Sequence, residues 1–189
     1  TLFRSAFGIN IVVNSRNEHC HLVCGHWRAA WEKSCAIVSE AMGVPIDGRS
    51  DVVVVSCGGY PKDINLYQSV KSLLNAAQAL KPRGTLVFLA ECREGGGAPE
   101  FFDWIEPLKR GELDAALRAD FSIAGYIFYA SCEVIANADV RILTRIPRQT
   151  ATDMRMRAYD DMNALIAAVD FADRDVTVIP YGGYVVPFE

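Results

Sequence analysis

Three side chains that could hold a small anion occur at helical spacing within residues 67–71. Tyr67, Gln68 and Lys71 are a phenol, an amide and an amine. Spacings of three and four positions place all three on one face of a helix. The ammonium supplies charge, and the amide and phenol supply directional donors and acceptors. Together they could orient a small anion that carries a hydroxyl group, although such a pattern more often marks a solvated helix face.

A glycine-containing loop precedes this helix and follows a buried strand. Residues 52–55 are four consecutive valines, a run typical of a parallel strand that is covered on both faces. Gly58 and Gly59 then give the backbone freedom, and we expect Asp63 to cap the helix. Ligands of open α/β sheets bind beyond the carboxyl ends of the strands. We therefore expect Gly58, Gly59 and Tyr60 to contribute to a binding site.

The remaining pattern predicts one α/β domain over residues 1–189. Strands at 9–13 and 22–23 flank a polar turn at 14–18 and form an N-terminal β-hairpin, which a helix at 27–42 follows. Strand 51–56, helix 63–80 and strand 85–90 form a βαβ unit. Further helices are expected at 99–108, 112–119, 122–136 and 159–171, and further strands at 140–145 and 176–180. The predicted fold is a layered α/β domain whose sheet is largely parallel, mixed at its edge and flanked by helices.

A second glycine loop follows the strand at 85–90. Residues 95–97 are three consecutive glycines, and we expect this loop to face the first one because parallel strands end at the same edge of the sheet. The loop lacks the Lys-Ser/Thr of a phosphate-binding P-loop, and no GxGxxG motif follows a strand. Nucleotide binding by these common routes is therefore disfavoured.

Composition argues against several classes of partner and location. The formal net charge is −4, whereas nucleic acids and anionic membranes reward a basic surface. The most apolar long stretch, residues 121–136, is too short to cross a bilayer of about 30 Å. The six cysteines form no CxxC pair, so we expect reduced thiols and a cytoplasmic protein. Cys57 lies beside the first loop, but a buried thiol is favoured over a nucleophile because no histidine is near in sequence.

Residues 19–26 are rich in metal-ligand types. The side chains in question are His19, Cys20, His21, Cys24 and His26. Strand alternation places His19 and His21 on one face and Cys20 and Cys24 on the other, which separates the ligands. The spacing matches no common closed zinc site. A hairpin with a partly exposed histidine face is favoured over a metal site.

Residues 51–61, Asp-Val-Val-Val-Val-Ser-Cys-Gly-Gly-Tyr-Pro, and 65–71, Asn-Leu-Tyr-Gln-Ser-Val-Lys, resemble the C-terminal domain of the nickel-dependent lactate racemase family. The likeness also includes the hairpin and helix at the start, the glycine loop at 90–97 and the closing strand at 176–180. It covers nearly the entire chain. The Tyr-Gln-x-x-Lys element after Gly-Gly-Tyr-Pro is its most specific part.

The resemblance implies a function and a role for three residues. In that family a nickel-pincer nucleotide, tethered to a lysine, takes a hydride from the α-carbon of a 2-hydroxy acid and returns it to either face. Lys71 and Gln68 match positions that contact the substrate, and Tyr67 lies beside them. The resemblance therefore implies that Lys71 and Gln68 take part in catalysis by holding the 2-hydroxy acid, with Tyr67 at the wall of the cleft.

The family's cofactor-bearing lysine, metal-binding histidine and acid–base histidines belong to an N-terminal domain that no segment here matches. We therefore expect this chain to be a piece of a longer protein that holds no metal itself and is inactive without its own N-terminal domain. The alternative is a non-catalytic α/β module that binds another small anion or has a regulatory role.

Overall fold

The structure is a computed structural model that describes residues 6–14, 16 and 18–189. Its contacts divide the chain into two compact units, Thr1–Pro45 and Ile46–Glu189. We call these unit 1 and unit 2, and each is described by itself. That residues 1–189 form a single domain stays a prediction.

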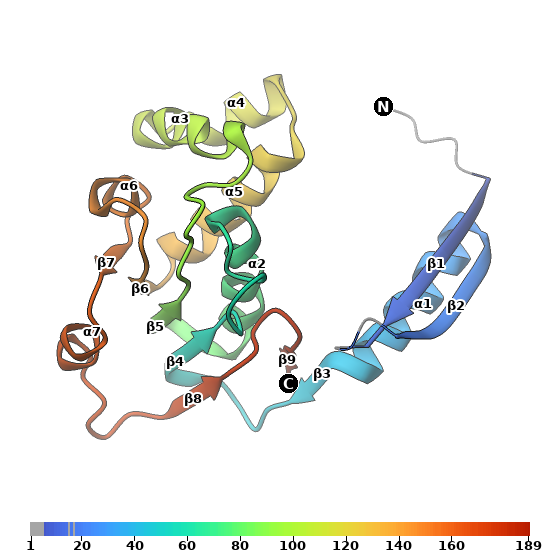
Figure 1. Ribbon diagram of the computed structural model, residues 1–189, viewed down its shortest axis with the longest axis horizontal. Helices are drawn as coiled ribbons and strands as arrows, with labels where there is room; N and C mark the ends of the chain where they lie inside the picture. Colours follow the sequence, from blue (N-terminus) through green and yellow to red (C-terminus); the bar gives the residue numbers. More distant parts are fainter. Residues whose placement is uncertain (1–5, 15, 17) are drawn as a thin grey trace. The chain divides into compact units, whose positions relative to one another are not determined.

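Unit 1 is an antiparallel hairpin followed by a helix. β1 (Phe7–Val13) pairs with β2 (His19–His26), and α1 (Trp27–Met42) and β3 (Gly43–Pro45) follow (Figure 1). The predicted hairpin and helix are confirmed, with longer strands than expected. Within the predicted turn, the Asn14 N–H donates to the Glu18 carbonyl at 3.1 Å. Ser15 and Asn17 of that turn lie outside the described residues.

The pairing of the hairpin corrects the expected arrangement of its histidines. A register irregularity between Val12 and Val13 pairs His21 with Val12 and His19 with Val13. Consecutive residues of a strand face opposite sides, so the extra residue on β2 prevents the two histidines from sharing a face as simple alternation predicts.

Unit 2 contains the parallel sheet. Its elements are β4 (Ser50–Ser56), α2 (Leu66–Ala76), the 3₁₀ turn η1 (Ala77–Ala79), β5 (Leu80–Leu89), the 3₁₀ segment η2 (Pro99–Trp104), α3 (Ile105–Arg110), α4 (Leu113–Ala119), α5 (Ile123–Ala136), β6 (Asp139–Leu143), α6 (Arg148–Asp153), β7 (Arg157–Tyr159), α7 (Met162–Ala168), β8 (Val176–Ile179) and β9 (Val186–Phe188). Five of the strands form one sheet in the order β7-β6-β5-β4-β8. Every ladder of this sheet is parallel, which confirms the predicted α/β fold and its parallel sheet. The antiparallel pairing expected at the edge is absent from these ladders, since both edge strands, β7 and β8, pair in parallel.

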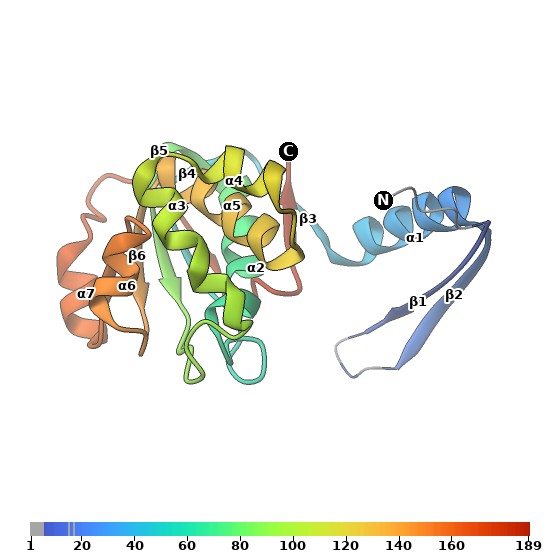
Figure 2. The same ribbon diagram turned by 90° about the horizontal axis from the view of Figure 1, so that it is seen from above.

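Helices cover both faces of the sheet, as the valine run in β4 requires. Leu165 of α7 and Val169, the residue after the helix, pack on one face against Val52 and Val87. α2 and α5 cover the other face, where the larger hydrophobic core lies (Figure 2). No helix among the described residues is long and apolar enough to span a membrane.

Several boundaries differ from those predicted. α2 begins at Leu66 rather than at Asp63, because Asn65 is the residue that caps it. β5 begins at Leu80 rather than at residue 85, so residues 80–84 belong to the strand. The last helix begins at Met162, since Asp161 accepts a hydrogen bond from the Ala164 N–H and caps it. Tyr159, the predicted start of that helix, ends β7.

Candidate functional site

The start of α2 is built by two loops that face each other. The Asn65 side chain accepts a hydrogen bond from the Gln68 N–H at 3.0 Å. The N–H groups of Leu66 and Tyr67, which precede Gln68 in the helix, donate to the Gly95 and Gly96 carbonyls of the second glycine loop, at 2.8 and 3.0 Å. These contacts satisfy donors that a helix start leaves open. The N–H groups of Cys92 and Glu94 donate to the carbonyls of Asp63 and Ile64, both at 2.9 Å, so the segments that contain the two glycine loops meet, as expected.

The structure brings Tyr67, Gln68 and Lys71 together. The Lys71 Nζ donates to Gln68 Oε1 at 2.7 Å and lies 5.5 Å from the centroid of the Tyr67 ring. The Tyr67 ring packs edge-on against Phe101, with ring centroids 5.9 Å apart. Lys71 is exposed, and no carboxylate of the described part of the chain forms an ion pair with it. The cluster therefore presents an accessible cation beside an amide and an aromatic ring.

The first glycine loop adopts the backbone that the sequence requires. Gly58 and Gly59 have φ angles of +90° and +79°, a region that side-chain-bearing residues rarely adopt. The Gly58 N–H donates to Ser56 Oγ at 3.0 Å. Tyr60 is 62% exposed, and the guanidinium of Arg93 lies 4.7 Å from its ring centroid. The loop thus presents an aromatic side chain to solvent rather than burying it.

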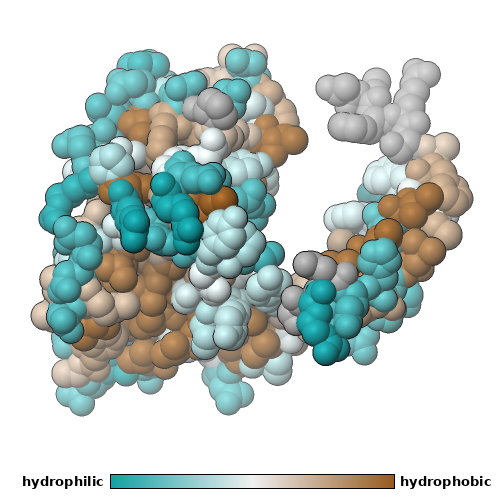
Figure 3. Space-filling view, in the orientation of Figure 1, coloured by the Kyte–Doolittle hydropathy of each residue, from teal (hydrophilic) through white to brown (hydrophobic). Residues whose placement is uncertain are grey.

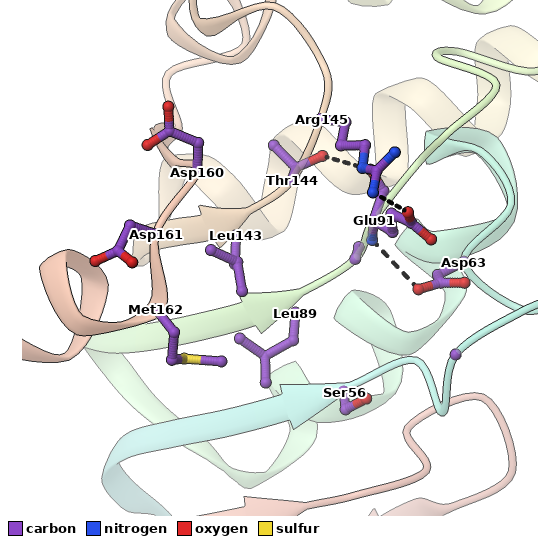
Figure 4. Close-up of a pocket in the computed structure, with 12 residues that line it drawn as sticks. Ser56, Asp63, Leu89, Glu91, Leu143, Thr144, Arg145, Asp160, Asp161 and Met162 are labelled. Carbon is purple, nitrogen blue, oxygen red and sulfur yellow. Dashed lines mark hydrogen bonds and ion pairs between the residues drawn. The ribbon is translucent and has the colours of Figure 1, made fainter.

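A cavity of about 480 Å³ lies at the carboxyl ends of β4, β5 and β6. Figure 4 shows Asp63, Glu91 and Arg145 grouped on one side of it and residues 160–162, which lead into α7, on the other. Of the six predicted site residues, Gly59 lines this cavity. Gly58, Tyr60, Tyr67, Gln68 and Lys71 are not among its lining residues.

The polar groups of the cavity are held by one another. Asp63 is 8% exposed, and its Oδ2 accepts from the Glu91 N–H at 3.3 Å. Its Oδ1 has no hydrogen-bond partner among the described residues. The Glu91 carboxylate pairs with Arg145 at 3.0 Å and with Arg93 at 3.1 Å. Asp63 therefore braces the chain after β5 instead of capping α2 as the sequence predicts.

Sequence reasoning missed two parts of this region. Glu91 and Arg145 each follow a strand of the sheet, so the rule that ligands bind at strand ends could have identified them as well as the first loop. The turn after β8 was also missed. In that turn the Gly182 N–H donates to the Ser56 carbonyl, and the Gly182 carbonyl accepts from the Asn75 side chain, both at 2.8 Å. The available signal was a Gly-Gly pair two residues after a strand.

The remaining chemistry-bearing residues of the sequence are thiols and histidines. Cys57 is fully buried, and burial raises the pKa of its thiol to about 11. The expectation of a buried thiol is confirmed. All six cysteines are free. Among residues 6–14, 16 and 18–189, no group of three or more His, Cys, Asp or Glu side chains could hold a metal ion.

Comparison with known families decides the relationship of this chain. Residues 46–186, almost the whole of unit 2, match the model of the lactate racemase C-terminal domain. The chain belongs to this family. The matched range contains the glycine loops, α2 and the cavity at the strand ends.

Two lactate racemases are similar to this chain in sequence. The lactate racemase of Thermoanaerobacterium thermosaccharolyticum is 38% identical over 104 residues, which cover 55% of this chain and 24% of that protein. The lactate racemase of Lactiplantibacillus plantarum is 36% identical over 98 residues, which cover 51% of this chain and 23% of that protein. The matched regions thus span about a quarter of each relative.

Two solved structures share the fold. The lactate racemase apoprotein from T. thermosaccharolyticum superposes with a TM-score of 0.81 at 30% identity, covering 97% of this chain and 46% of its own. A protein from Thermotoga maritima superposes with a TM-score of 0.63 at 14% identity, covering 96% of this chain and 48% of its own. This chain therefore spans less than half of the length of either structure.

Proposed function

We propose that this chain is the substrate-binding half of a nickel-pincer-dependent racemase or epimerase of 2-hydroxy acids such as lactate. The observation that carries the proposal is the cluster on α2, in which an exposed ammonium lies 2.7 Å from the Gln68 amide oxygen and 5.5 Å from the Tyr67 ring. The two relatives that match in sequence are both lactate racemases. Their activity supports the proposed reaction, and the cluster supports the proposed role.

Each member of the cluster has a distinct role in the proposal. Lys71 binds the substrate carboxylate or polarises its α-oxygen through N–H groups that the contact with Gln68 leaves free, since an ammonium has three donors. Gln68 accepts from Lys71 through its oxygen and donates from its NH₂ group to the substrate, which orients it. Tyr67 forms the wall of the cleft. Gly58, Gly59 and Tyr60 complete the substrate site from the first loop in this proposal.

The described residues do not fit a nickel site, because they contain no group of three metal-ligating side chains. We propose that the pincer nucleotide, which supplies the hydride chemistry when bound, is held by an N-terminal domain outside this chain. Residues 1–189 alone should then not interconvert D- and L-2-hydroxy acids. Six free cysteines, three of them exposed, fit a protein of a reducing compartment such as the cytoplasm.

The first test removes the cation. In the full-length gene product that contains this chain, Lys71→Ala should lower kcat/KM for D- and L-lactate by about ten- to a hundredfold. Loss of a charge-assisted contact of about 1.5–3 kcal/mol in the transition state would produce that change. Because Lys71 is exposed, the melting temperature should be retained. Racemisation is measured by chiral chromatography and the fold by circular dichroism.

The matched control is Lys109→Ala, which removes an exposed lysine that pairs with Glu106 on α3. It should leave kcat/KM unchanged. If Lys71→Ala racemises lactate as fast as the Lys109→Ala control, the assignment of Lys71 is wrong. A full-length product without racemase activity on any 2-hydroxy acid would instead favour the non-catalytic anion-binding module.

A further inference from the structure

Another hollow of unit 2, which we call the arginine hollow, is lined by three arginines. It has a volume of about 430 Å³, and its charged groups are Arg83, Arg155, Arg157 and Asp139. It lies where β6 and β7 begin, beside the end of α5. Figure 2 shows the end of α5 and the start of β5 at the edge of the sheet opposite the glycine loops. Figure 3 looks onto the edge that carries the glycine loops, so the arginine hollow lies on the far side of that view.

The charges of the arginine hollow do not balance. Asp139, its one lining carboxylate, pairs with Arg157 at 3.0 Å and with Arg141 at 2.7 Å. Arg83 and Arg155 are exposed and form no ion pair with any residue that the structure describes. Three guanidiniums and one carboxylate leave a formal charge of +2 on the lining, in a chain whose net charge is −4. A local excess of this kind attracts multivalent anions.

The end of α5 does not account for these cations. Cations gather at the C-terminus of a helix because its last carbonyls carry a partial negative charge. Here the Asn137 N–H and side chain donate to the carbonyls of Val134 and Glu133, at 3.0 and 2.9 Å. The Arg83 N–H donates to the Asn137 carbonyl at 2.8 Å, whereas its guanidinium and that of Arg155 have no hydrogen-bond partner among the described residues. Both guanidiniums are therefore available to a ligand.

The backbone holds both unpaired arginines in a conformation that side-chain-bearing residues rarely adopt. The φ angles are +62° at Arg83 and +65° at Arg155, where glycine would be free of steric strain. Each N–H is anchored, that of Arg83 to the Asn137 carbonyl and that of Arg155 to the Thr152 carbonyl, both at 2.8 Å. Strain of this kind is typical of ligand sites, where it fixes a side chain in place before the ligand arrives.

A largely apolar hollow adjoins the arginine hollow. Its volume is about 360 Å³, and Asn137 and Ala138 line both hollows. Its other apolar lining residues are Ala77, Leu80, Pro82 and Val134. Its two cations pair with carboxylates, and Glu133 adds a negative charge. This second hollow therefore suits an uncharged body rather than a second anionic group.

We propose that the arginine hollow binds a phosphate ester whose apolar body lies in the adjoining hollow. A planar guanidinium donates two parallel N–H groups to two phosphate oxygens. A phosphate monoester carries a charge of about −1.5 to −2 at neutral pH, which matches the charge of +2 on the lining, whereas a carboxylate matches half of it. This site is at the amino ends of the strands. It goes beyond the proposed function and does not depend on it.

Isothermal titration calorimetry of residues 1–189 at pH 7.5 and low salt tests the site with three probes. Phenyl phosphate, which carries both the dianion and the apolar body, should bind at one site. Inorganic phosphate, which lacks the apolar body, and benzoate, which carries a single charge, should each bind at least about tenfold more weakly. Equal affinity for phenyl phosphate and benzoate, or no measurable binding of phenyl phosphate, would overturn the proposal.

Glycine substitutions separate ligand binding from a structural role. Arg83→Gly and Arg155→Gly each remove a guanidinium and relieve the left-handed backbone, so each should weaken phenyl phosphate binding by at least about tenfold while the melting temperature is retained. The matched control is Arg118→Ala, which removes an exposed arginine that pairs with Asp114 on α4, and it should leave the affinity unchanged. Affinity that survives both glycine substitutions, or that falls with Lys71→Ala instead, would assign the anion to another part of the surface and overturn the proposal.

Discussion

Lys71 is oriented by neighbours from its own helix. The hydrogen bond to Gln68 spans three positions and the contact with Tyr67 spans four, which are the spacings at which helical side chains meet. Local sequence alone is therefore enough to assemble the cluster once α2 forms. The direction in which the cluster faces depends on what α2 packs against, and that is a property of the whole unit.

For Cys57 the tertiary surroundings, rather than the local sequence, determine the reactivity of the side chain. Its Sγ donates to the Ser69 carbonyl at 3.7 Å, and burial is the largest cause of its raised pKa. The thiol stays protonated at neutral pH, so it is a poor nucleophile although it lies next to the glycine loop. Cys132 behaves similarly, since burial raises the pKa of its thiol to about 12.

The raised pKa of Cys57 makes the free energy of unfolding depend on pH. The pKa of Cys57 rises from 9.0 to about 11 on folding, so below pH 9.0 the thiol is protonated in both states. Between pH 9.0 and about 11 the unfolded chain loses its proton first, which favours unfolding. The free energy of unfolding should fall over this window by at most about 3 kcal/mol from this thiol, since one pKa unit corresponds to about 1.4 kcal/mol.

Urea denaturation of residues 1–189 from pH 8 to pH 10.5 measures this decline. Cys57→Ala removes the thiol and should give a shallower decline than the unmodified chain, while lysines and tyrosines titrate equally in both proteins. Parallel slopes in the two proteins would contradict the assignment of this part of the pH dependence to Cys57.

α2 is held in place by contacts at its start and along its side. Carbonyls of the second glycine loop accept from its first N–H groups. The Asn75 side chain donates to the Gly182 carbonyl in the turn after β8. The helix that carries the proposed site is therefore held by two loops from distant parts of the sequence, and its position at the sheet edge depends on both.

The turn after β8 gives a matched pair of glycine substitutions. A Cβ on Gly182 would lie 2.4 Å from Val55 Cγ2, whereas the nearest atom to a Cβ on Gly183 is Ser72 Oγ at 3.5 Å. Gly182→Ala should therefore lower the free energy of unfolding by about 1–3 kcal/mol through overpacking. Gly183→Ala should change it by less than about 0.5 kcal/mol.

Urea denaturation of both variants at pH 7 provides the comparison, with the midpoint and slope fitted separately. If Gly182→Ala and Gly183→Ala unfolded at the same urea concentration, the described packing of this turn on β4 would be contradicted. In the full-length protein, Gly182→Ala should also reduce activity, because the turn supports α2 through Asn75.

At the scale of the whole molecule, the two units differ in how much they bury. All members of both hydrophobic clusters, including Phe88, Phe101 and Phe128, belong to unit 2. Among the described residues of unit 1, two apolar residues, Val12 and Ala30, are buried. A unit with its own core is expected to fold independently, and a unit without one is expected to need a partner.

Deletion of residues 1–45 tests this difference. Residues 46–189 should unfold in one cooperative transition, because the deletion removes no member of either hydrophobic cluster. Circular dichroism in the far and near ultraviolet during urea denaturation measures the transition. Loss of the near-ultraviolet signal in the absence of urea would show that the core of unit 2 needs residues 1–45.

The sequence predicted those elements whose pattern is local. The valine run indicated a strand covered on both faces, and the periodicity of residues 27–42 predicted α1 with its observed ends. Boundaries that depend on caps were predicted less well. Asp63 and Asn65 are both good caps, and the choice between them depends on the distant Glu91 N–H, which takes up the Asp63 carboxylate.

The sequence by itself determined the family, the α/β class and the grouping of Tyr67, Gln68 and Lys71, because a motif, a hydrophobic period and a helical spacing all lie within short stretches of chain. Only the tertiary structure decided that Asp63, Glu91 and Arg145 line one cavity and that the turn at Gly182 braces α2. These features join residues far apart in sequence, and their contacts exist only after the parallel strands have aligned their carboxyl ends.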